Sequence, residues 1–350
     1  MIPVSQPWIT ERERKYVQEA VDSGWVSSTG PFIQRFEEAF ASYVGAKHAL
    51  GVINGTSACH LALISVGIEP GDEVIVPATT FVATANAVKY CGANVRVVDI
   101  DKDSWNMDTI QLHASQKTRA IFFVHLYGNM NNMDALRDAS NGLVLVEDAC
   151  EALGGEWKGK KAGSLAKASS FSFYANKTLS TGEGGMFTCD DDDVYEKARL
   201  FRGQGQTARY YHPVIGYNYR MTNIQAALGL AQLERIDDIM SEKRRVYDRY
   251  VSRLQIPVFA REPSESKHSR WAVTVVVRNP ERTSVVLAEN GVESRRVFYP
   301  ICDLPPYVGT GNCPNARWFR DQGITLPSYS ELTNSQIDNV CDLVNSSENT

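Results

Sequence analysis

The chain has 350 residues, 43% of them hydrophobic, which is enough to build one large domain with a smaller companion. Its 36 basic and 41 acidic residues give a net charge of -5, which argues against a nucleic-acid groove or an anionic membrane surface and favours a small-molecule partner. Seven scattered cysteines, none spaced as CxxC, predict free thiols in a reducing compartment and neither disulfides nor a metal site.

The first residues, MIPVSQPWIT, lack the basic start and apolar run of a secretion signal, so we expect a cytoplasmic protein. Short apolar runs then alternate with helical stretches such as HLALISVG and FVATANAVKYCG, which end at glycine. Strands this apolar predict an α/β domain around a mostly parallel sheet, with ligands at the carboxyl ends of the strands. The expected strands are Ala49 to Ile53, Glu73 to Val76, Val95 to Val98, Ala120 to Val124, Leu143 to Val146, Ser169 to Phe173 and Gly185 to Thr188.

The pattern changes near residue 235. We expect a large domain with an N-terminal segment over residues 1–235 and a small C-terminal α+β domain over residues 236–350. The elements expected in this region are a long charged helix from Leu233 to Leu254, a polar stretch from Pro257 to His268, the strand WAVTVVV, the helix SVVLAEN closed by Gly291, and a terminal helix after Thr333 with Ser335 as its cap.

Two strand ends in the large domain carry polar side chains that suit a ligand. In NGTSACHLAL, Asn54 to Leu63, a strand ends in a small polar turn that opens a helix. Its backbone N–H groups and hydroxyls suit a phosphate, or they form an ordinary helix cap. In LVLVEDACEALGG, a strand delivers Glu147 and Asp148, and a carboxylate there suits a cationic ring nitrogen or caps the next helix.

Lys177 follows a further strand end, SSFSF, which carries Ser172. A lysine in this place is a point charge for phosphate, a nucleophile that forms a Schiff base with a carbonyl, or a solvated surface charge. A P-loop needs its glycines before the lysine, whereas Gly182, Gly184 and Gly185 all follow it. Binding of a nucleoside triphosphate by this loop is therefore disfavoured.

The stretch GYNYRMTNIQAALGLAQLER places Asn218 and Arg220 ahead of an amphipathic helix, where they suit an anion or an interface loop. The order of the four features is informative. A phosphate-binding turn, a strand-end aspartate, a serine and then a lysine form the set that pyridoxal 5'-phosphate requires.

The sequence also resembles the DegT/StrS family of nucleotide-sugar aminotransferases, which are fold-type I enzymes that use pyridoxal phosphate. The resemblance runs nearly from end to end and implies a large domain around a mostly parallel sheet, with no metal. The blocks that carry it are WVSSTGPFIQRFEEAFA, NGTSACHLAL, PGDEVIVPATTFVATANAVKY, VHLYGNMNNMDAL, VEDACEALG, SFSFYANKTLSTGEGGM, FRGQGQ, GYNYRMTNIQAALG and YPICDLPPY.

The resemblance assigns the reacting end of the cofactor to four residues. Lys177 is expected to hold the cofactor as a Schiff base and to move the proton during amino transfer. Asp148 is expected to pair with the ring nitrogen, Phe81 to stack on the ring, and Glu151 to lie near its phenolic oxygen.

The resemblance also indicates which residues bind the phosphate of the cofactor. Thr56, Ser57 and Ser172 are expected to bind it from the same chain. Asn218 is expected to contact it from the neighbouring subunit, with Arg220 close by. The resemblance therefore implies a homodimer with shared active sites.

Within the family, the blocks NKTLSTGEGGM, FRGQGQ and PVIGYNYRMTNIQAALGLAQLER, together with Glu151, are most similar to perosamine-type enzymes. We therefore expect transfer of an amino group from L-glutamate to C4 of a GDP-linked 4-keto-6-deoxyhexose, with the cofactor cycling through pyridoxamine 5'-phosphate. The alternatives are a viosamine-type 4-aminotransferase acting on a UDP- or dTDP-4-keto-6-deoxyglucose, a 3-aminotransferase, or a non-catalytic binding protein. Sugar dehydratases of the same fold carry histidine in place of Lys177.

Two departures from the family pattern fall where substrate contacts are expected. Cys302 stands where relatives often have histidine, and the loop QTARYYHPV replaces the perosamine-type RRYWFPV. Arg295, in VESRR, either faces the substrate or is solvated.

Overall fold

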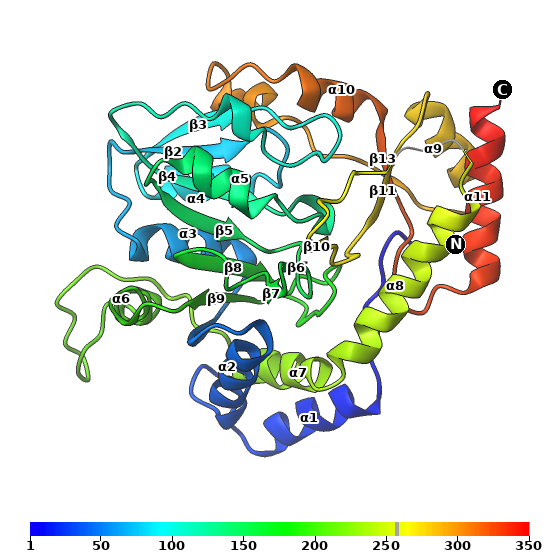
Figure 1. Ribbon diagram of the computed structural model, residues 1–350. Helices are drawn as coiled ribbons and strands as arrows, with labels where there is room; N and C mark the ends of the chain where they lie inside the picture. The colour runs from blue at the N-terminus through cyan, green and yellow to red at the C-terminus, as the bar shows by residue number, and fades with distance from the viewer. Residues whose placement is uncertain (256–258, 350) are drawn as a thin grey trace.

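A seven-stranded sheet forms the centre of the larger part of the molecule (Figure 1). The computed structural model describes residues 1–255 and 259–349. The strands of this sheet are β1 (His48–Val52), β2 (Glu73–Pro77), β3 (Asn94–Val98), β4 (Thr118–Val124), β5 (Val144–Asp148), β8 (Ala168–Ser172) and β9 (Gly185–Cys189). Their order is β1-β9-β8-β5-β4-β2-β3, and only β9 is antiparallel to its neighbours. The α/β class and the seven predicted strands, each within two residues at either end, are confirmed.

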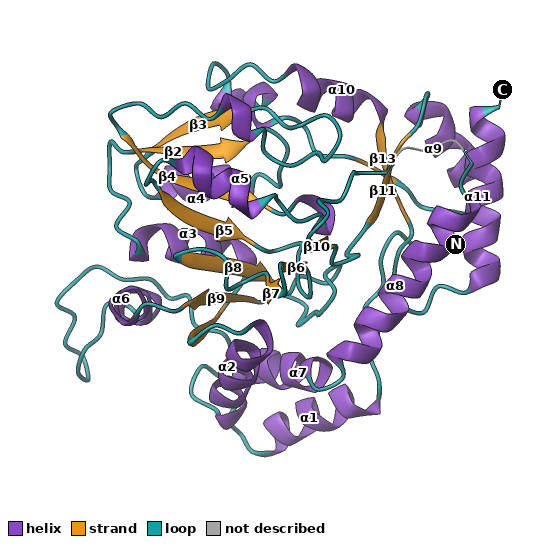
Figure 2. Ribbon diagram, viewed as in Figure 1, coloured by secondary structure: helices purple, strands orange, loops and turns teal. Residues whose placement is uncertain are grey.

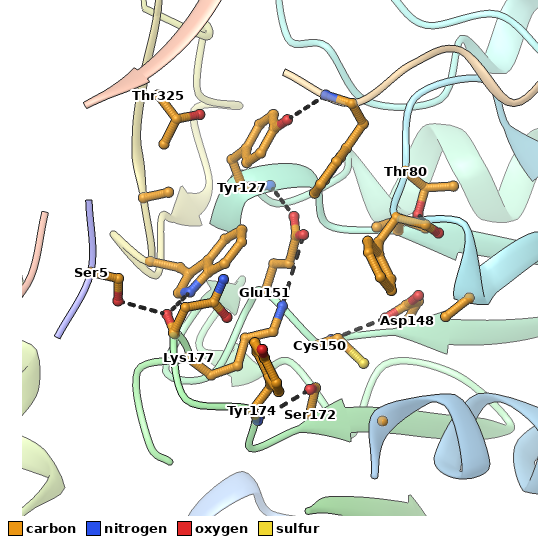
Figure 3. Close-up of a pocket in the computed structure, with 18 of the residues that line it drawn as sticks. Ser5, Thr80, Tyr127, Asp148, Cys150, Glu151, Ser172, Tyr174, Lys177 and Thr325 are labelled. Atoms are coloured by element: carbon orange, nitrogen blue, oxygen red, sulfur yellow. Dashed lines mark hydrogen bonds and ion pairs between the residues drawn. The ribbon is translucent and has the colours of Figure 1, made fainter. Parts of the chain in front are cut away.

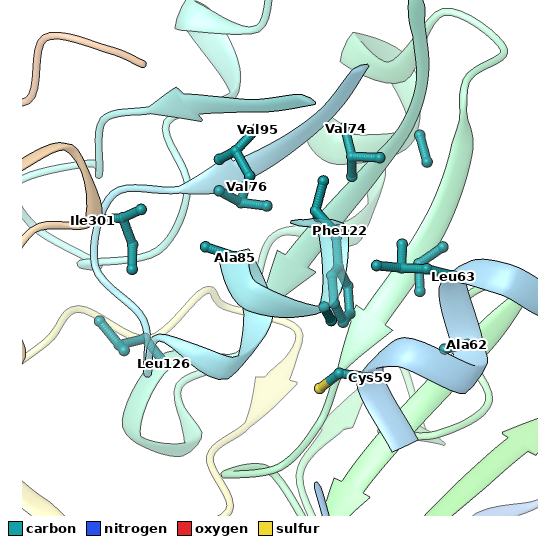
Figure 4. Close-up of a cluster of buried hydrophobic side chains, with 14 of the residues drawn as sticks. Cys59, Ala62, Leu63, Val74, Val76, Ala85, Val95, Phe122, Leu126 and Ile301 are labelled. Carbon is teal, nitrogen blue, oxygen red and sulfur yellow. The ribbon is translucent and has the colours of Figure 1, made fainter. Parts of the chain in front are cut away.

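Helices cover both faces of this sheet, as Figure 2 shows. Because side chains alternate across a strand, Val74 and Val76 of β2 belong to one hydrophobic cluster and Ile75 to the other. Figure 4 shows part of the first cluster, in which Phe122 of β4 lies near Cys59 and Leu63. The first cluster includes α3 (Gly55–Ser65), α4 (Ala83–Tyr90) and α6 (Asp192–Arg202), and the second includes α1 (Glu11–Asp22), α2 (Pro31–Val44), α5 (Met133–Ser140) and α7 (Asn223–Leu233).

The C-terminal part has its own antiparallel sheet in the order β11-β13-β12. Its elements are α8 (Ile236–Arg253), β11 (Val273–Val276), α9 (Pro280–Glu289), β12 (Arg295–Arg296), β13 (Gly323–Leu326) and α11 (Asn334–Glu348). All of these except β12 contribute side chains to a third hydrophobic cluster. The start of the chain joins this part, because Ile2 pairs with Val292, and both termini lie beside it (Figure 1).

Other C-terminal residues pack on the large sheet. Ala316 and Phe319 of α10 (Pro314–Gln322) belong to the cluster that contains Val76. The division at residues 235 and 236 stays a prediction. The remaining short elements are the sheet β10 (Ser266–Lys267), β6 (Glu156–Trp157) and β7 (Lys160–Lys161), with the 3-10 helices η1 (Thr109–Gln111), η2 (Leu126–Gly128), η3 (Ile301–Asp303) and η4 (Pro305–Tyr307).

The predicted long helix from Leu233 to Leu254 is observed as α8 (Ile236–Arg253) and begins three residues later than expected. Arg235 separates it from α7, because this residue leaves the helical conformation and its guanidinium binds the Glu13 carboxylate at 2.6 Å and the Trp8 carbonyl. The predicted polar stretch from Pro257 to His268 begins outside the described residues. No helix in the described part of the chain has the length and apolar character of a membrane span.

The cap of α11 is also corrected. Thr333, and not Ser335, is the N-cap: its hydroxyl oxygen accepts from the Gln336 N–H at 3.3 Å, and the Gln336 side chain accepts from the Thr333 N–H at 2.9 Å. This is a capping box, which satisfies two backbone donors at the start of the helix.

Replacing the two hydroxyl residues separately tests this assignment. Thr333→Ala is expected to lower the free energy of unfolding by about 1 kcal/mol, because it removes the capping hydroxyl. Ser335→Ala is the matched control and should change it by less than about 0.5 kcal/mol. Urea denaturation measures both, and an equal loss in the two variants would contradict the capping assignment.

Candidate active site

A cavity of about 550 Å³ opens where the carboxyl ends of β4, β5 and β8 meet the start of α3 and the C-terminal part of the chain. Figure 3 shows its lining, with Asp148, Glu151, Ser172 and Lys177 around one space. The cavity lies at the edge of the sheet where ligands of such folds bind. It brings together the predicted residues Thr56, Phe81, Asp148, Glu151, Ser172 and Lys177.

Asp148, the last residue of β5, lies at the base of the cavity and is 5% exposed. One carboxylate oxygen accepts from the Thr84 hydroxyl at 2.7 Å, and the other accepts from the Cys150 N–H at 3.1 Å. In the described part of the chain, no cationic side chain lies within ion-pair distance of Asp148. A buried carboxylate without a counter-charge is suited to a cationic ligand, which is the property that a pyridinium nitrogen requires.

Lys177 is not a solvated surface lysine. Its side chain is 13% exposed, and its amine lies 3.9 Å from the Glu151 carboxylate and 4.1 Å from the centre of the Trp271 ring. The loop between β8 and β9 is fixed by backbone hydrogen bonds, among them Phe173 to Gly184 at 2.8 Å and Lys177 to Tyr174 at 2.9 Å. The amine therefore enters the cavity from an ordered turn.

Glu151 is a buried acid whose pKa is raised. Burial raises the pKa of its carboxyl to about 7, and the charge of Lys177 opposes that shift. The Tyr127 N–H donates to the carboxylate at 2.7 Å. Glu151 therefore exchanges a proton near neutral pH, beside the amine of Lys177.

The predicted phosphate end forms where α3 begins. A Cβ atom on Gly55 would lie 2.6 Å from the Ser172 Cβ, so glycine allows the helix start to approach β8 closely. Thr56 and Ser172 both line the cavity there. Ser57 does not line it: its backbone N–H donates to the Asn54 side chain at 2.8 Å, which caps the helix.

Asn218 and Arg220 do not reach the cavity of their own chain. Asn218 pairs with Gly203 and Arg220 with Val52, both as isolated bridges. Burial, followed by the charge of Arg202, lowers the pKa of Arg220. That Asn218 contacts the phosphate in a neighbouring subunit, with Arg220 close by, stays a prediction.

Three aromatic residues of the cavity, Tyr127, Trp271 and Phe298, were not identified from the sequence, which pointed only to Phe81. Tyr127 stacks between Trp271 and Phe298, with ring centres 6.1 and 5.3 Å away, and Phe298 meets Phe81 at 5.9 Å. Phe81 itself is 56% exposed, so one face of its ring is open to a ligand. No local pattern marks these aromatics, because a single buried tyrosine or tryptophan in a sequence is indistinguishable from core.

The two predicted substrate positions have different outcomes. Arg295 lines the cavity, and its half-exposed side chain pairs with Glu293 at 3.1 Å. Cys302 does not: it is 4% exposed and belongs to the hydrophobic cluster that also contains Cys313. The position where the family pattern led us to expect substrate contacts is therefore buried and lies outside the cavity of its own chain.

Cys59, Asp148 and Cys150 place three potential metal ligands within 4.8 Å of one another. The hydrogen bond from Cys59 and burial raise the pKa of the Cys150 thiol well above its usual value, and the pKa of Cys59 is raised as well. Since metals bind the thiolate, these protonated thiols are poor ligands at neutral pH.

Comparison with known proteins finds relatives that match nearly the whole chain. Residues 7–345 match the DegT/DnrJ/EryC1/StrS aminotransferase family. The chain is 45% identical to GDP-perosamine synthase of Caulobacter vibrioides, over 97% of this chain and 96% of that protein, and 43% identical to GDP-perosamine synthase of Escherichia coli O157:H7, over 98% of both.

Solved structures of a sugar aminotransferase have the same fold as this chain. A putative sugar aminotransferase of Streptococcus pneumoniae, Spr1654, superposes in its PMP form with a TM-score of 0.93 at 29% identity, over 100% of this chain and 99% of that one. The PLP form of the same protein superposes with a TM-score of 0.92 at 30% identity, over 99% and 98% of the two chains.

The buried acid gives a pH-dependent stability that Glu151→Gln removes. The folded protein without cofactor keeps the Glu151 proton up to a pKa of about 7, whereas the unfolded chain releases it near the ordinary pKa of 4.5. The stabilisation from the neutral acid is therefore complete below pH 4.5 and is lost as the pH rises to about 7. Relative to wild type, Glu151→Gln should gain up to about 3 kcal/mol between those limits.

Thermal unfolding at pH 5 and pH 8 measures this effect, with the exposed Glu289→Gln as the matched control. The melting temperature of Glu151→Gln should rise relative to wild type between the two pH values. An unchanged difference would mean that Glu151 titrates as an ordinary surface acid.

Proposed function

The chain belongs to the DegT/DnrJ/EryC1/StrS aminotransferase family, and on that premise we propose that it transfers the amino group of L-glutamate to C4 of a GDP-linked 4-keto-6-deoxyhexose, giving a perosamine-type 4-amino-4,6-dideoxy sugar. The family resemblance found in the sequence and the expected aminotransferase class are confirmed. Three GDP-perosamine synthases, at 39–45% identity over nearly the full length of both chains, support the substrate.

One observation carries the proposal: a cavity at the carboxyl edge of the sheet brings together three groups. They are the largely buried amine of Lys177, the buried acid Glu151 with a pKa of about 7, and the buried carboxylate of Asp148, which has no ion-pair partner in the described part of the chain. Pyridoxal phosphate, when bound, supplies an aldehyde that condenses with amines and a ring that takes up the electrons of a deprotonated carbon. The residues fit this group. Lys177 would hold the aldehyde carbon, and Asp148 would keep the ring nitrogen protonated.

The other cavity residues fix the cofactor at its ends. Thr56 and Ser172, at the start of α3 and the end of β8, receive the phosphate, where the helix dipole favours an anion. Phe81, which is 56% exposed, would offer an open face to the ring of the cofactor.

Two groups handle the proton that moves during amino transfer. Lys177 is the amine that would take a proton from the donor amino acid and hold it for return. Glu151, whose pKa is raised to about 7, lies 3.9 Å from that amine and stabilises its charged form when ionised. The protonation state of Glu151 therefore influences whether the Lys177 amine is charged or neutral, and both groups are largely buried.

The assembly that we propose is a homodimer in the cytosol. Asn218 and Arg220, which lie outside the cavity of their own chain, complete the phosphate site of the partner. Seven free thiols, six of them buried, support a reducing compartment.

Product analysis tests the substrate. Purified protein with pyridoxal phosphate and L-glutamate should aminate a GDP-linked 4-keto-6-deoxyhexose at C4, with a kcat/KM at least about tenfold above that for the dTDP-linked sugar, the order expected for contacts to the base. NMR of the product identifies the aminated carbon, and Lys177→Ala is the inactive control. A preference for the dTDP sugar would establish the viosamine-type alternative, while amination at C3 would contradict a 4-aminotransferase.

Mixing two inactive variants tests the shared site. Lys177→Ala and Asn218→Ala are each expected to be impaired alone. In a hybrid dimer, one site receives Lys177 from one subunit and Asn218 from the other, so exchange should restore up to about a quarter of the wild-type activity. Each variant mixed with itself is the control, and no recovery after proven subunit exchange would contradict a site built from two chains.

A further inference from the structure

Lys243 is a buried lysine outside the cavity that the proposed reaction does not use. It lies on α8 and is 6% exposed, and burial lowers the pKa of its amine to about 7. Its amine donates to the carbonyl oxygen of Trp271 at 2.6 Å and to that of Ser328. In the described part of the chain it has no carboxylate partner. Burying an amine in this way costs stability, so a protein that does so needs these two hydrogen bonds.

The two carbonyls belong to facing segments of one strand pair. The antiparallel ladder of β11 and β13 ends with Val273 opposite Leu326, and continuing the same register places Trp271 opposite Ser328 two residues beyond that pair. Both lie beyond the ladder, where the strands separate at the cavity. The Lys243 amine therefore joins the two segments after their mutual hydrogen bonding has ended.

Trp271 connects this junction to the reacting amine. The Lys177 amine lies 4.1 Å from the centre of the Trp271 ring, and the indole N–H donates to the carbonyl of Asn176 at 2.8 Å. Asn176 directly precedes Lys177 in the chain. The indole thus contacts the lysine side chain and also fixes the backbone from which it extends.

We propose that Lys243 is a positioning residue for Lys177: its amine holds the backbone of Trp271 and Ser328 together, and Trp271 in turn fixes the Lys177 side chain and its backbone in the cavity. This inference rests on the proposed role of Lys177 in amino transfer. Lys243 does not touch substrate or cofactor, and its effect passes through the indole.

The chemistry of the amine suits this task in either protonation state. A neutral amine has two N–H groups, which match the two carbonyls, and the ammonium form has three. The junction therefore does not depend on whether Lys243 carries a charge. A methionine of similar length keeps the packing but has no donor.

The test compares Lys243→Met with Arg244→Met, which changes the exposed neighbour on the same helix. We expect Lys243→Met to lower kcat by about tenfold to a hundredfold, because misplacing a reacting group by about 1 Å has an effect of this size. KM for the nucleotide sugar should change less than about twofold, since no substrate contact is lost. The visible absorption band of the cofactor on Lys177 should form more slowly in this variant, while Arg244→Met should match wild type.

A double-mutant cycle with Trp271→Leu separates positioning from general loss of structure. If Lys243 acts through the indole, then Lys243→Met should lower kcat little further once Trp271 is leucine. Losses that multiply, or a kcat unchanged in Lys243→Met, would overturn the inference. If Lys243→Met does not fold, Trp271→Phe, which removes the indole N–H donor and makes the aromatic ring smaller, should show the same loss of kcat at nearly constant KM, and an unchanged kcat would overturn it.

The wild-type protein separates this inference from the proposed function. Wild type that forms no visible band with pyridoxal phosphate would contradict the function of Lys177 itself. A wild type that forms the band and transfers amino groups, together with an unaffected Lys243→Met, would contradict only the role of Lys243.

Discussion

The parallel pairing of β5 with β8 is the constraint on which the site depends. Val146 to Asp148 of β5 pair in register with Ala168 to Ser170 of β8, so the two strands end side by side. One strand end then supplies Asp148 and the other supplies Ser172 and the turn that carries Lys177. The buried Glu147, which accepts from Ser169 at 2.8 Å and from the backbone N–H of Gly163 at 2.9 Å, ties the strands and the chain between them behind this edge. The carboxylate that we propose for the ring nitrogen and the amine that we propose for the aldehyde are thus held at neighbouring strand ends of the central sheet.

The C-terminal part of the chain completes the cavity that the sheet begins. Arg295 comes from its small sheet, and Trp271 and Ser328 lie just beyond strands β11 and β13 of that sheet. The first residues of the chain reach the same place, where the Ser5 hydroxyl donates to the Asn176 carbonyl at 3.3 Å. These segments lie far apart in the sequence. Their convergence encloses Lys177 and excludes water from an amine whose reactivity depends on its surroundings.

The sequence predicts those features that local chemistry marks. Apolar, β-branched runs identify the seven strands, and the ends of these runs identify Asp148, Ser172 and Lys177 as candidates before any relative is considered. The first residue of α8 and the cap at Thr333 were not predicted correctly, since the contact of Arg235 with Glu13 decides where α8 begins and two neighbouring hydroxyls compete for the cap of α11. Trp271 and Lys243 were missed for a deeper reason. Their roles arise only where distant segments meet, and a lysine in the charged sequence of α8 looks like a surface residue until the fold buries it.

The central claim is that Lys177 carries the cofactor, and one measurement addresses it most directly. Protein incubated with pyridoxal phosphate, reduced with borohydride and digested should yield one peptide with a covalently attached pyridoxyl group, and fragmentation should place that group on Lys177. Reduction after L-glutamate has converted the cofactor to its amine form should leave the peptide unmodified, because the lysine is then released. Modification of another lysine, or none before glutamate is added, would contradict the account.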